Sequence, residues 1–366
     1  MRERPIVSAV VGFVLAAVTA VVLVVTPDAG ALQMLQGQNG ALAATPNDPS
    51  FGQQWGLHNT GQVVNGAKGT AGADINAPAA WGVASDSRSV VVAELDSGVD
   101  YHHPDLAANI WSNPGGVGGC AAGTHGFNVV ANTCDPLDDF GHGTQVAGVL
   151  GAVGNNGAGI AGVAWRTTIL PVKWTDSAGH GSTARLIRAL EWVLSAKAAG
   201  VNIRVANDSP VFSGTGFSQA LSAELDKLAA NGILFVTAAG NNKSNNDTTP
   251  RYPCDYGKAN ELCVAATEQH DRVASFSNFG ATTVDLAAPG NNIFTTNLGG
   301  GYVFNKGGSF AAPLVSGTAA LVLSVQDMSA SALKARILGG VDPLVSLAGK
   351  VRSGGRLDLC NALPGC

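Results

Sequence analysis

The feature of this sequence that most constrains its fold is a regular alternation of short apolar runs with segments of helical periodicity. The run 89–96 is rich in β-branched residues and ends on an acid, and small apolar residues at helical spacing follow it. Helices between strands act as crossover connections, which favour parallel pairing. The sequence therefore predicts an α/β fold, with a mostly parallel, doubly wound sheet covered by helices on both faces. The predicted strands are 89–96, 167–174, 201–207, 233–241, 262–267 and 284–290. The predicted helices are 143–153, 182–200, 218–232 and the apolar run after Ser309 that includes 318–324.

The composition suits one globular domain. Hydrophobic residues make up 46% of the 366 residues and charged residues only 13%, which is not the balance of a disordered chain. The pattern runs from residue 46 to residue 366 without a low-complexity break, so we predict a single domain there and expect a monomer. The net charge of −5 and the lack of any Lys/Arg run predict no nucleic-acid partner.

The N-terminus has the pattern of a targeting segment. Two arginines precede an uncharged stretch at residues 6–25, and Ala29-Gly30-Ala31 then fits an A-x-A cleavage site. Residues 1–31 are therefore predicted to be a secretory signal peptide, or an uncleaved anchor in which residues 6–25 tether the protein to the membrane. Both alternatives place the rest of the chain outside the cytoplasm, as a secreted or outward-facing protein. Residues 32–45 read as a linker.

Six cysteines agree with an oxidising compartment. No C-x-x-C and no Cys/His zinc spacing occurs, so disulfides are the favoured interpretation. Six cysteines allow 15 pairings, and some of the thiols can also stay reduced. We predict the pairs that close short loops, which are Cys120–Cys134, Cys254–Cys263 and Cys360–Cys366.

Four polar residues have the types needed for acyl transfer by a serine. That chemistry needs a nucleophile, a base, an acid that orients the base, and a donor to the oxyanion. The candidates, in chain order, are Asp96, His142, Asn241 and Ser309. Each also has a simpler interpretation. Acids and Asn residues commonly end strands and turns, a lone His is commonly a surface residue, and Ser commonly caps a helix.

The stretches around these residues resemble the active-site blocks of the subtilases, the subtilisin-like serine peptidases. The blocks are AELDSGVDYHHPDL, DDFGHGTQVAGVLGA, FVTAAGN and GGSFAAPLVSG, and the order Asp, His, Ser is the one known for subtilisin. The resemblance extends from Asn47 to about Gly340 and is strongest to the thermitase-like branch of secreted bacterial enzymes. It implies a three-layer subtilisin-like fold and a serine endopeptidase that cleaves extended polypeptides.

The resemblance also implies a role for each candidate. Ser309 would attack the scissile carbonyl, and His142 would take its proton and pass it to the leaving amine. Asp96 would hold the imidazole in the useful tautomer, and Asn241 would donate to the oxyanion together with the Ser309 N–H.

A structural Ca²⁺ ion is implied in the same way. The matching positions are Asp48, Asp105 and the loop 153–160 (VGNNGAGI), which offer the oxygen ligands that Ca²⁺ prefers. The implied ligands are the side chains of Asp48, Asp105 and Asn156 and the carbonyls of Val153, Ala158 and Ile160. The alternative is that the two acids are turn residues in a loop that binds no ion.

The chain departs from the family next to the serine. The usual G-T-S-M is Gly307-Gly308-Ser309-Phe310 here. Gly308 lacks a hydroxyl and frees the backbone, and the ring of Phe310 is expected to crowd the leaving-group side.

The implied substrate-binding edge departs as well. It reads NDSPVFSG, so the implied substrate contacts are Asn207, Ser209 and Val211. Pro210 has no N–H, and Val211 in place of the usual glycine would narrow the P1 pocket, which predicts a preference for small P1 residues or slow cleavage. The alternative to an active enzyme is a catalytically weakened subtilase-fold protein that serves as a binding or scaffold module.

Overall fold

The computed structural model describes residue 1, residues 42–209 and residues 216–366. The predicted signal peptide or anchor and most of the predicted linker lie outside the described residues, as do Pro210 and Val211. The contacts within the chain define two units, Met1–Gly40 and Ala41–Cys366. Only Met1 of the first unit is described, and every described helix and strand belongs to the second.

A nine-stranded sheet forms the centre of this second unit, in the order β12-β13-β9-β8-β7-β6-β3-β5-β4. Every neighbouring pair is parallel except the terminal pair β12 and β13. The strands are β3 (Asp86–Asp96), β4 (Phe127–Asn128), β5 (Arg166–Lys173), β6 (Ile203–Asp208), β7 (Leu234–Ala238), β8 (Glu261–Thr267), β9 (Leu286–Pro289), β12 (Asp342–Pro343) and β13 (Gly355–Arg356). The predicted mostly parallel α/β sheet is confirmed.

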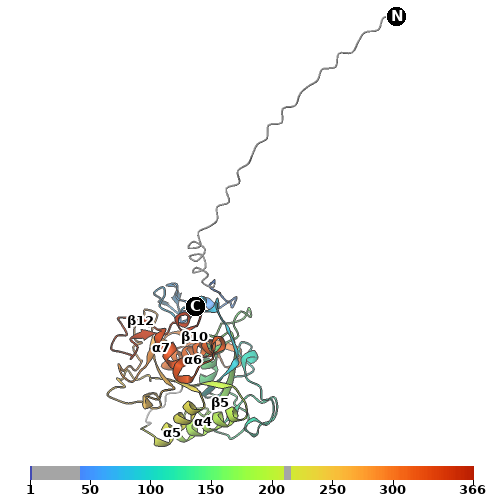
Figure 1. The fold of residues 1–366 in the computed structure, drawn as a ribbon, viewed down its shortest axis with the longest axis vertical. Coiled ribbons are helices and arrows are strands. Elements are labelled where there is room, and N and C mark those ends of the chain that lie inside the picture. The colour runs from blue at the N-terminus through green and yellow to red at the C-terminus, as the bar shows by residue number, and fades with distance from the viewer. Residues whose placement is uncertain (2–41, 210–215) are drawn as a thin grey trace. The chain divides into compact units, whose positions relative to one another are not determined.

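Helices cover both faces of the sheet, because both faces are apolar. In β3 the side chains of Val90 and Val92 join the core beneath α3 (His142–Gly151) and α6 (Gly308–Val325). Val91 and Ala93 point the other way, into the core beneath α4 (Thr183–Ala198) and α5 (Gln219–Ala230). Figure 1 shows α4 and α5 side by side and apart from α6 and α7 (Ala330–Gly339). This alternation gives the three layers that were predicted.

Helix starts follow the sequence. Ser182 caps the N-terminus of α4, and its hydroxyl accepts from the Arg185 N–H. Ser218 caps α5 in the same way. The remaining short elements are α2 (Ala77–Trp81), α8 (Leu359–Ala362), the hairpins β1 (Val63–Val64) with β2 (Ala67–Lys68) and β10 (Ile293–Asn297) with β11 (Gly301–Asn305), and the 3₁₀ turns η1 (Phe51–Gln53), η2 (Ala107–Asn109), η3 (Val117–Gly119), η4 (Cys254–Tyr256) and η5 (Leu298–Gly300).

The helix α6 runs through the core. Within the described part of the chain it is the one helix long and apolar enough to cross a membrane, with a mean hydropathy of 1.6. However, 89% of it is buried inside the protein, which is the placement of a core helix in a globular domain.

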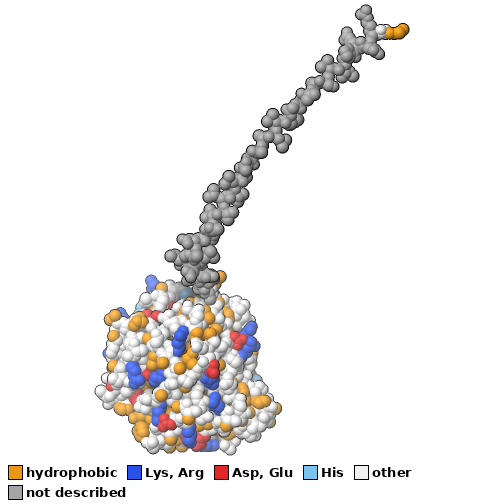
Figure 2. Space-filling view, in the orientation of Figure 1, with side chains coloured by type: hydrophobic (Ala, Val, Ile, Leu, Met, Phe, Trp, Pro, Cys, Tyr) orange, Lys and Arg blue, Asp and Glu red, His pale blue; other side chains and the backbone are white. Residues whose placement is uncertain are grey.

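The surface seen in Figure 2 carries Lys and Arg side chains interspersed with Asp and Glu, among small groups of apolar side chains. The three predicted disulfides, Cys120–Cys134, Cys254–Cys263 and Cys360–Cys366, are all present. They account for all six cysteines of the chain.

Candidate active site

Asp96 and His142 form a hydrogen-bonded pair at the carboxyl edge of the sheet. Asp96 is the last residue of β3 and is 1% exposed, and His142 is the first residue of α3. The His142 Nδ1 atom lies 2.8 Å from Asp96 Oδ1 and 2.9 Å from Oδ2. Because the carboxylate holds Nδ1, the Nε2 atom is the ring nitrogen that remains for a proton transfer.

Asp138, which no sequence pattern singled out, fixes the start of α3. Its Oδ2 accepts from the Thr144 N–H at 2.9 Å and from the Thr144 hydroxyl at 2.6 Å, and its Oδ1 accepts from the Gly141 N–H at 2.9 Å. The helix cap, Gly141, has no side chain to satisfy these donors, so Asp138 supplies the acceptors. The signal in the sequence was an acid four residues before His142, shortly ahead of the predicted helix.

The charges around His142 favour its protonated form. Burial lowers the pKa of His142, but the charge of Asp96, the hydrogen bond to Asp96 and the charge of Asp138 outweigh burial. The pKa of His142 therefore lies above its usual value. An imidazolium formed during a reaction would be stabilised by the same two acids.

A third acid, Glu94, lies beside the pair. It precedes Asp96 by two residues on β3 and so projects from the same face of the sheet. Its side chain is fully buried, and neither carboxyl oxygen has a hydrogen-bond partner among the described residues. Burial, followed by the charges of Asp96 and Asp138, raises the pKa of Glu94 well above its usual value. The protonated form is thus favoured where an exposed glutamate would ionise.

Ser309 stands at the start of α6, but it does not cap the helix. The cap residue is Gly307, and no side chain caps this helix. Ser309 is 5% exposed, and its hydroxyl donates to the Ser209 carbonyl at 3.0 Å. The Ser209 hydroxyl donates in return to the Ser309 carbonyl at 3.0 Å. In the part of the chain that the structure describes, the Ser309 hydroxyl therefore points to the residue that follows β6 and makes no hydrogen bond to His142.

Asn241 follows β7 and is oriented by the backbone that precedes the serine. Its Oδ1 accepts from the Gly308 N–H at 2.8 Å. Neither the Asn241 Nδ2 nor the Ser309 N–H has an acceptor among residues 42–209 and 216–366. Two unpaired N–H donors beside a serine hydroxyl have the chemistry of an oxyanion site.

A cavity of about 210 Å³ brings the four candidate residues together. Asp96, His142, Asn241 and Ser309 all line it, so side chains from four separated segments meet at one place. The remaining lining residues are Phe140, Thr175 and Gly179, which were not identified from the sequence.

The two unusual neighbours of Ser309 have structural roles. The β-carbon of any residue in place of Gly308 would lie 3.2 Å from the Ala238 β-carbon, which is tighter than ordinary contact. Phe310 is 1% exposed, does not line the cavity, and packs with its ring centroid 5.8 Å from that of His142. The expectation that its ring crowds the leaving-group side was therefore wrong, because the ring points into the core.

The predicted substrate contacts on β6 are held inward. Asn207 and Ser209 are both fully buried. Asn207 Oδ1 accepts from the Ser316 hydroxyl of α6 at 2.8 Å, and its Nδ2 donates to Ser209 Oγ at 3.0 Å. The side chains of Asn207 and Ser209 are thus occupied, and only the Ser209 carbonyl faces the site. Val211 lies outside the described residues.

The residues implied for Ca²⁺ lie close together. Asp48 and Asp105 are 4% and 0% exposed, and the charge of Asp105 acts on Asp48. Burial is the main cause that raises the pKa of Asp48, which indicates that its negative charge is poorly compensated. Asp48 Oδ2 accepts from the Asn155 N–H at 2.6 Å, but Oδ1 is buried without a partner among the described residues. Two close, buried carboxylates with one unpaired oxygen fit a divalent cation.

The loop 153–160 supports this fit in part. In the described structure, the carbonyls of Val153, Ala158 and Ile160 accept no hydrogen bond. A β-carbon at Gly159 would lie 2.4 Å from Asp105 Oδ2, so the loop needs glycine there to close around the acid. Asn156 is the exception. Its Nδ2 donates to Asp105 Oδ1 at 2.7 Å and its Oδ1 accepts from the Ala158 N–H at 2.7 Å, so its oxygen is already used.

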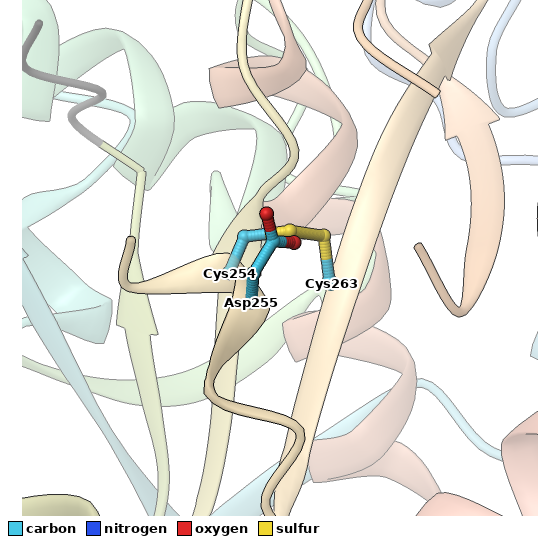
Figure 3. Close-up of side chains that lie close together, drawn as sticks. All are labelled: Cys254, Asp255 and Cys263. Atoms are coloured by element: carbon cyan, nitrogen blue, oxygen red, sulfur yellow. A yellow bond between two sulfur atoms is a disulfide. The ribbon is translucent and has the colours of Figure 1, made fainter. Parts of the chain in front are cut away.

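A second group of metal-ligand types does not form a metal site. Cys254, Asp255 and Cys263 lie close enough to share an ion, as Figure 3 shows. However, the two sulfur atoms are bonded to each other, so neither is a thiolate ligand.

Comparison with known proteins places the chain in a family. Residues 87–344 match the profile of the Subtilase family. The chain is 36% identical over 283 residues to the "Thermophilic serine proteinase" of Bacillus sp. (strain AK1), covering 77% of this chain and 60% of that protein. It is 33% identical over 320 residues to "Thermitase" of Thermoactinomyces vulgaris, covering 87% of this chain and 99% of that protein.

Solved structures agree with this assignment. A structure of "Proteases from Pseudoalteromonas arctica" superposes with a TM-score of 0.72 at 26% identity, covering 87% of this chain and 99% of that chain. A "cold adapted subtilisin-like serine proteinase" superposes with a TM-score of 0.62 at 26% identity, covering 83% and 96%. The chain therefore belongs to the subtilase family and is a subtilisin-like serine endopeptidase of thermitase-like sequence.

Proposed function

We propose that this protein hydrolyses peptide bonds of extended polypeptides through Ser309, with His142 as the base and Asp96 as the residue that orients it. The observation that carries the proposal is the Asp96–His142 pair, which lines the same cavity as Ser309 and Asn241. A buried carboxylate on Nδ1 selects the tautomer in which Nε2 accepts a proton.

The proposed reaction begins when the Ser309 hydroxyl turns from the Ser209 carbonyl to His142 Nε2. Ser309 Oγ bonds to the scissile carbonyl carbon while its proton passes to His142, and the developing oxyanion accepts from Asn241 Nδ2 and the Ser309 N–H. His142 then protonates the leaving amine, the C–N bond breaks, and an acyl-enzyme remains. Water, giving its proton to His142, attacks the acyl carbon, and Ser309 leaves as the hydroxyl.

The substrate is expected to lie as an added strand along the backbone at Ser209, just past the end of β6. Extended peptides pair with exposed backbone edges, and β6 itself is already paired on both sides, with β3 and β7. The Ser209 carbonyl supports this placement, because it faces the site and already accepts a hydrogen bond from Ser309. Of the predicted contacts, the backbone of Ser209 would carry this pairing, because the backbone of Asn207 already pairs with β3 and β7. A small P1 residue remains our expectation from Val211, and cleavage of a peptide library that favours large aromatic P1 residues would contradict it.

Ca²⁺ is proposed as a structural ion held by the carboxylates of Asp48 and Asp105 and the carbonyls of Val153, Ala158 and Ile160. Bound there, it would neutralise two close acids and stabilise the fold. Asn156 would join only if its amide turned over. We further propose that residues 1–31 direct the chain out of the cytoplasm, as a signal peptide or as a membrane tether. One chain supplies every residue of the site, so a monomer is sufficient.

A fluorophosphonate probe tests the proposal, because it labels only a serine activated by its neighbours. We expect the purified protein with added Ca²⁺ to be labelled, and Ser309→Ala not to be. Ser316→Ala is the matched control, since that hydroxyl bonds Asn207 in the core. The alternative scaffold function is favoured by the Ser309 hydroxyl pointing to Ser209. Folded, Ca²⁺-loaded protein that resists the probe would support that function and overturn ours.

A further inference from the structure

An apolar patch lies at the start of α3, beside His142. It is formed by Phe140 and Leu298, which are 48% and 37% exposed. Phe140 lies two residues before His142 and lines the active-site cavity. Leu298 packs beside Gly141, where an added β-carbon would lie 3.4 Å from Leu298 Cδ1. Phe140 thus exposes a large apolar side chain in the active-site cavity, and Leu298 lies next to it beside Gly141.

Phe140 is held in place on one side only. Its N–H donates to Asp138 Oδ1 at 3.0 Å, which ties its backbone to the carboxylate that starts α3. The turn at Gly179 packs against the ring, because a β-carbon there would lie 2.6 Å from Phe140 Cζ. Gly179 lines the cavity as well. One part of the ring therefore packs against this turn, and the remainder is open to a ligand, since the residue is 48% exposed.

The charges nearby leave the patch apolar. Asp96 is the one carboxylate among the residues that line the cavity, and it is buried against His142. The exposed carboxylate of Asp139, beside Phe140, is paired with Lys173 at 2.6 Å. No Lys or Arg is among the described residues that line the cavity. A side chain entering beside Phe140 would meet the ring. The acid next to Leu298 is Asp100, whose Oδ2 accepts from the Gly299 N–H at 3.0 Å, and it does not line the cavity.

We propose that Phe140 is a specificity-determining residue that selects an apolar side chain on the substrate residue lying against His142. This inference rests on the proposed peptidase function. Burying such a side chain against the ring contributes to transition-state binding, and one or two methylene groups in an apolar pocket change kcat/KM about 10-fold or more. The selected residue is either P2, which lies one residue before P1 on the acyl side of the scissile bond, or P1′, which lies directly on its leaving-group side.

The test is a peptide series cleaved by the full chain with Ca²⁺. P2 and P1′ are varied separately between Leu, Phe, Ser and Asn, and kcat/KM is measured for each peptide. The wild-type protein is expected to prefer Leu or Phe at one of these positions by about 10-fold. Phe140→Ala is expected to bring the Leu-to-Ser and Phe-to-Ser ratios of kcat/KM at that position close to 1, and Phe140→Leu is expected to keep most of the preference.

Phe217→Ala is the matched control. Phe217 is another exposed phenylalanine, at 58%, but it packs against Tyr252 and Tyr256 and does not line the cavity. It should leave the preference unchanged. A Phe140→Ala enzyme that is active and retains the wild-type preference would overturn this inference alone. A wild-type protein that cleaves no peptide and resists the fluorophosphonate probe would overturn the peptidase proposal, and this inference with it.

Discussion

His142 lies beside acids whose charges raise its pKa, whereas its burial lowers it. The charge and hydrogen bond of Asp96 and the charge of Asp138 keep its pKa raised. A general base must be neutral, so kcat/KM should fall as the pH drops through the raised pKa of His142 in the free enzyme. We expect the midpoint of this acid limb above about 6.5, the value for an unperturbed histidine. Removing the charge in Asp138→Asn should lower the midpoint.

Asp139→Asn is the control for this pH profile. Asp139 follows Asp138 in the chain, but its carboxylate forms an ion pair with Lys173. This variant should leave the midpoint in place. A wild-type midpoint at or below the unperturbed value, or equal midpoints in the wild type and Asp138→Asn, would contradict the assignment of these charges to His142.

The buried Glu94 predicts how the free energy of unfolding depends on pH. Its pKa is raised in the folded protein, chiefly by burial, so the folded state holds a proton that the unfolded chain releases above about pH 4.5. The free energy of unfolding contributed by Glu94 is therefore fully present below the unfolded pKa and is lost as the pH rises toward the folded pKa. Glu94→Gln, which cannot ionise, should be more stable than the wild type by a margin that grows with pH.

Urea unfolding at about pH 5 and about pH 8 measures this margin. Glu191→Gln, a change at an exposed position on α4, should show no pH-dependent margin. If the stability difference between Glu94→Gln and the wild type is the same at both pH values, the pKa of Glu94 is not raised in the folded protein.

At the scale of elements, the start of α6 is fitted to the end of β7. A side chain at 308 would crowd Ala238, whose β-carbon lies 3.2 Å from the position of the new one. Gly308→Thr, which restores the residue usual in the family, is therefore expected to cost about 1–3 kcal/mol in unfolding free energy. Ala238→Gly should remove the clash, so the double variant should be more stable than the sum of the two single changes predicts. Additive changes in a double-mutant cycle would contradict this fit.

The elements and the four candidate residues were predictable, whereas the surroundings of those residues were not. Apolar runs ending on Asp96 and near Asn241 locate one sheet edge, because parallel strands end together. The partners of Ser209 and Asn207 depend on where α6 docks, which no local pattern encodes. The same holds for Phe140, whose exposed ring is explained by Gly179 and the cavity. Asp138 could have been found, because acids before a helix start are a local signal.

At the scale of the whole molecule, the proposed Ca²⁺ site joins segments more than 100 residues apart. Asp48 bonds the Asn155 N–H, and the Ser50 N–H donates to the Gly159 carbonyl at 2.9 Å, so the start of the domain is tied to the loop after α3. Without a cation, the buried carboxylates of Asp48 and Asp105 repel each other. An ion bound only to the folded state at 100 times its Kd stabilises it by about 2.7 kcal/mol, so chelation should lower Tm by about 5 °C.

Asp48→Asn removes one of these two charges and tests whether the two acids bind an ion. It should abolish most of the Tm difference between Ca²⁺ and chelator, while it relieves the repulsion and makes the ion-free protein no less stable than the ion-free wild type. Asp327→Asn, which changes an acid paired with Arg204, should keep the full Ca²⁺ response. Because the ion is proposed to be structural, the rate of fluorophosphonate labelling well below Tm should be the same with and without Ca²⁺. A Tm that does not respond to Ca²⁺ in the wild type would show that the two acids are turn residues and hold no ion.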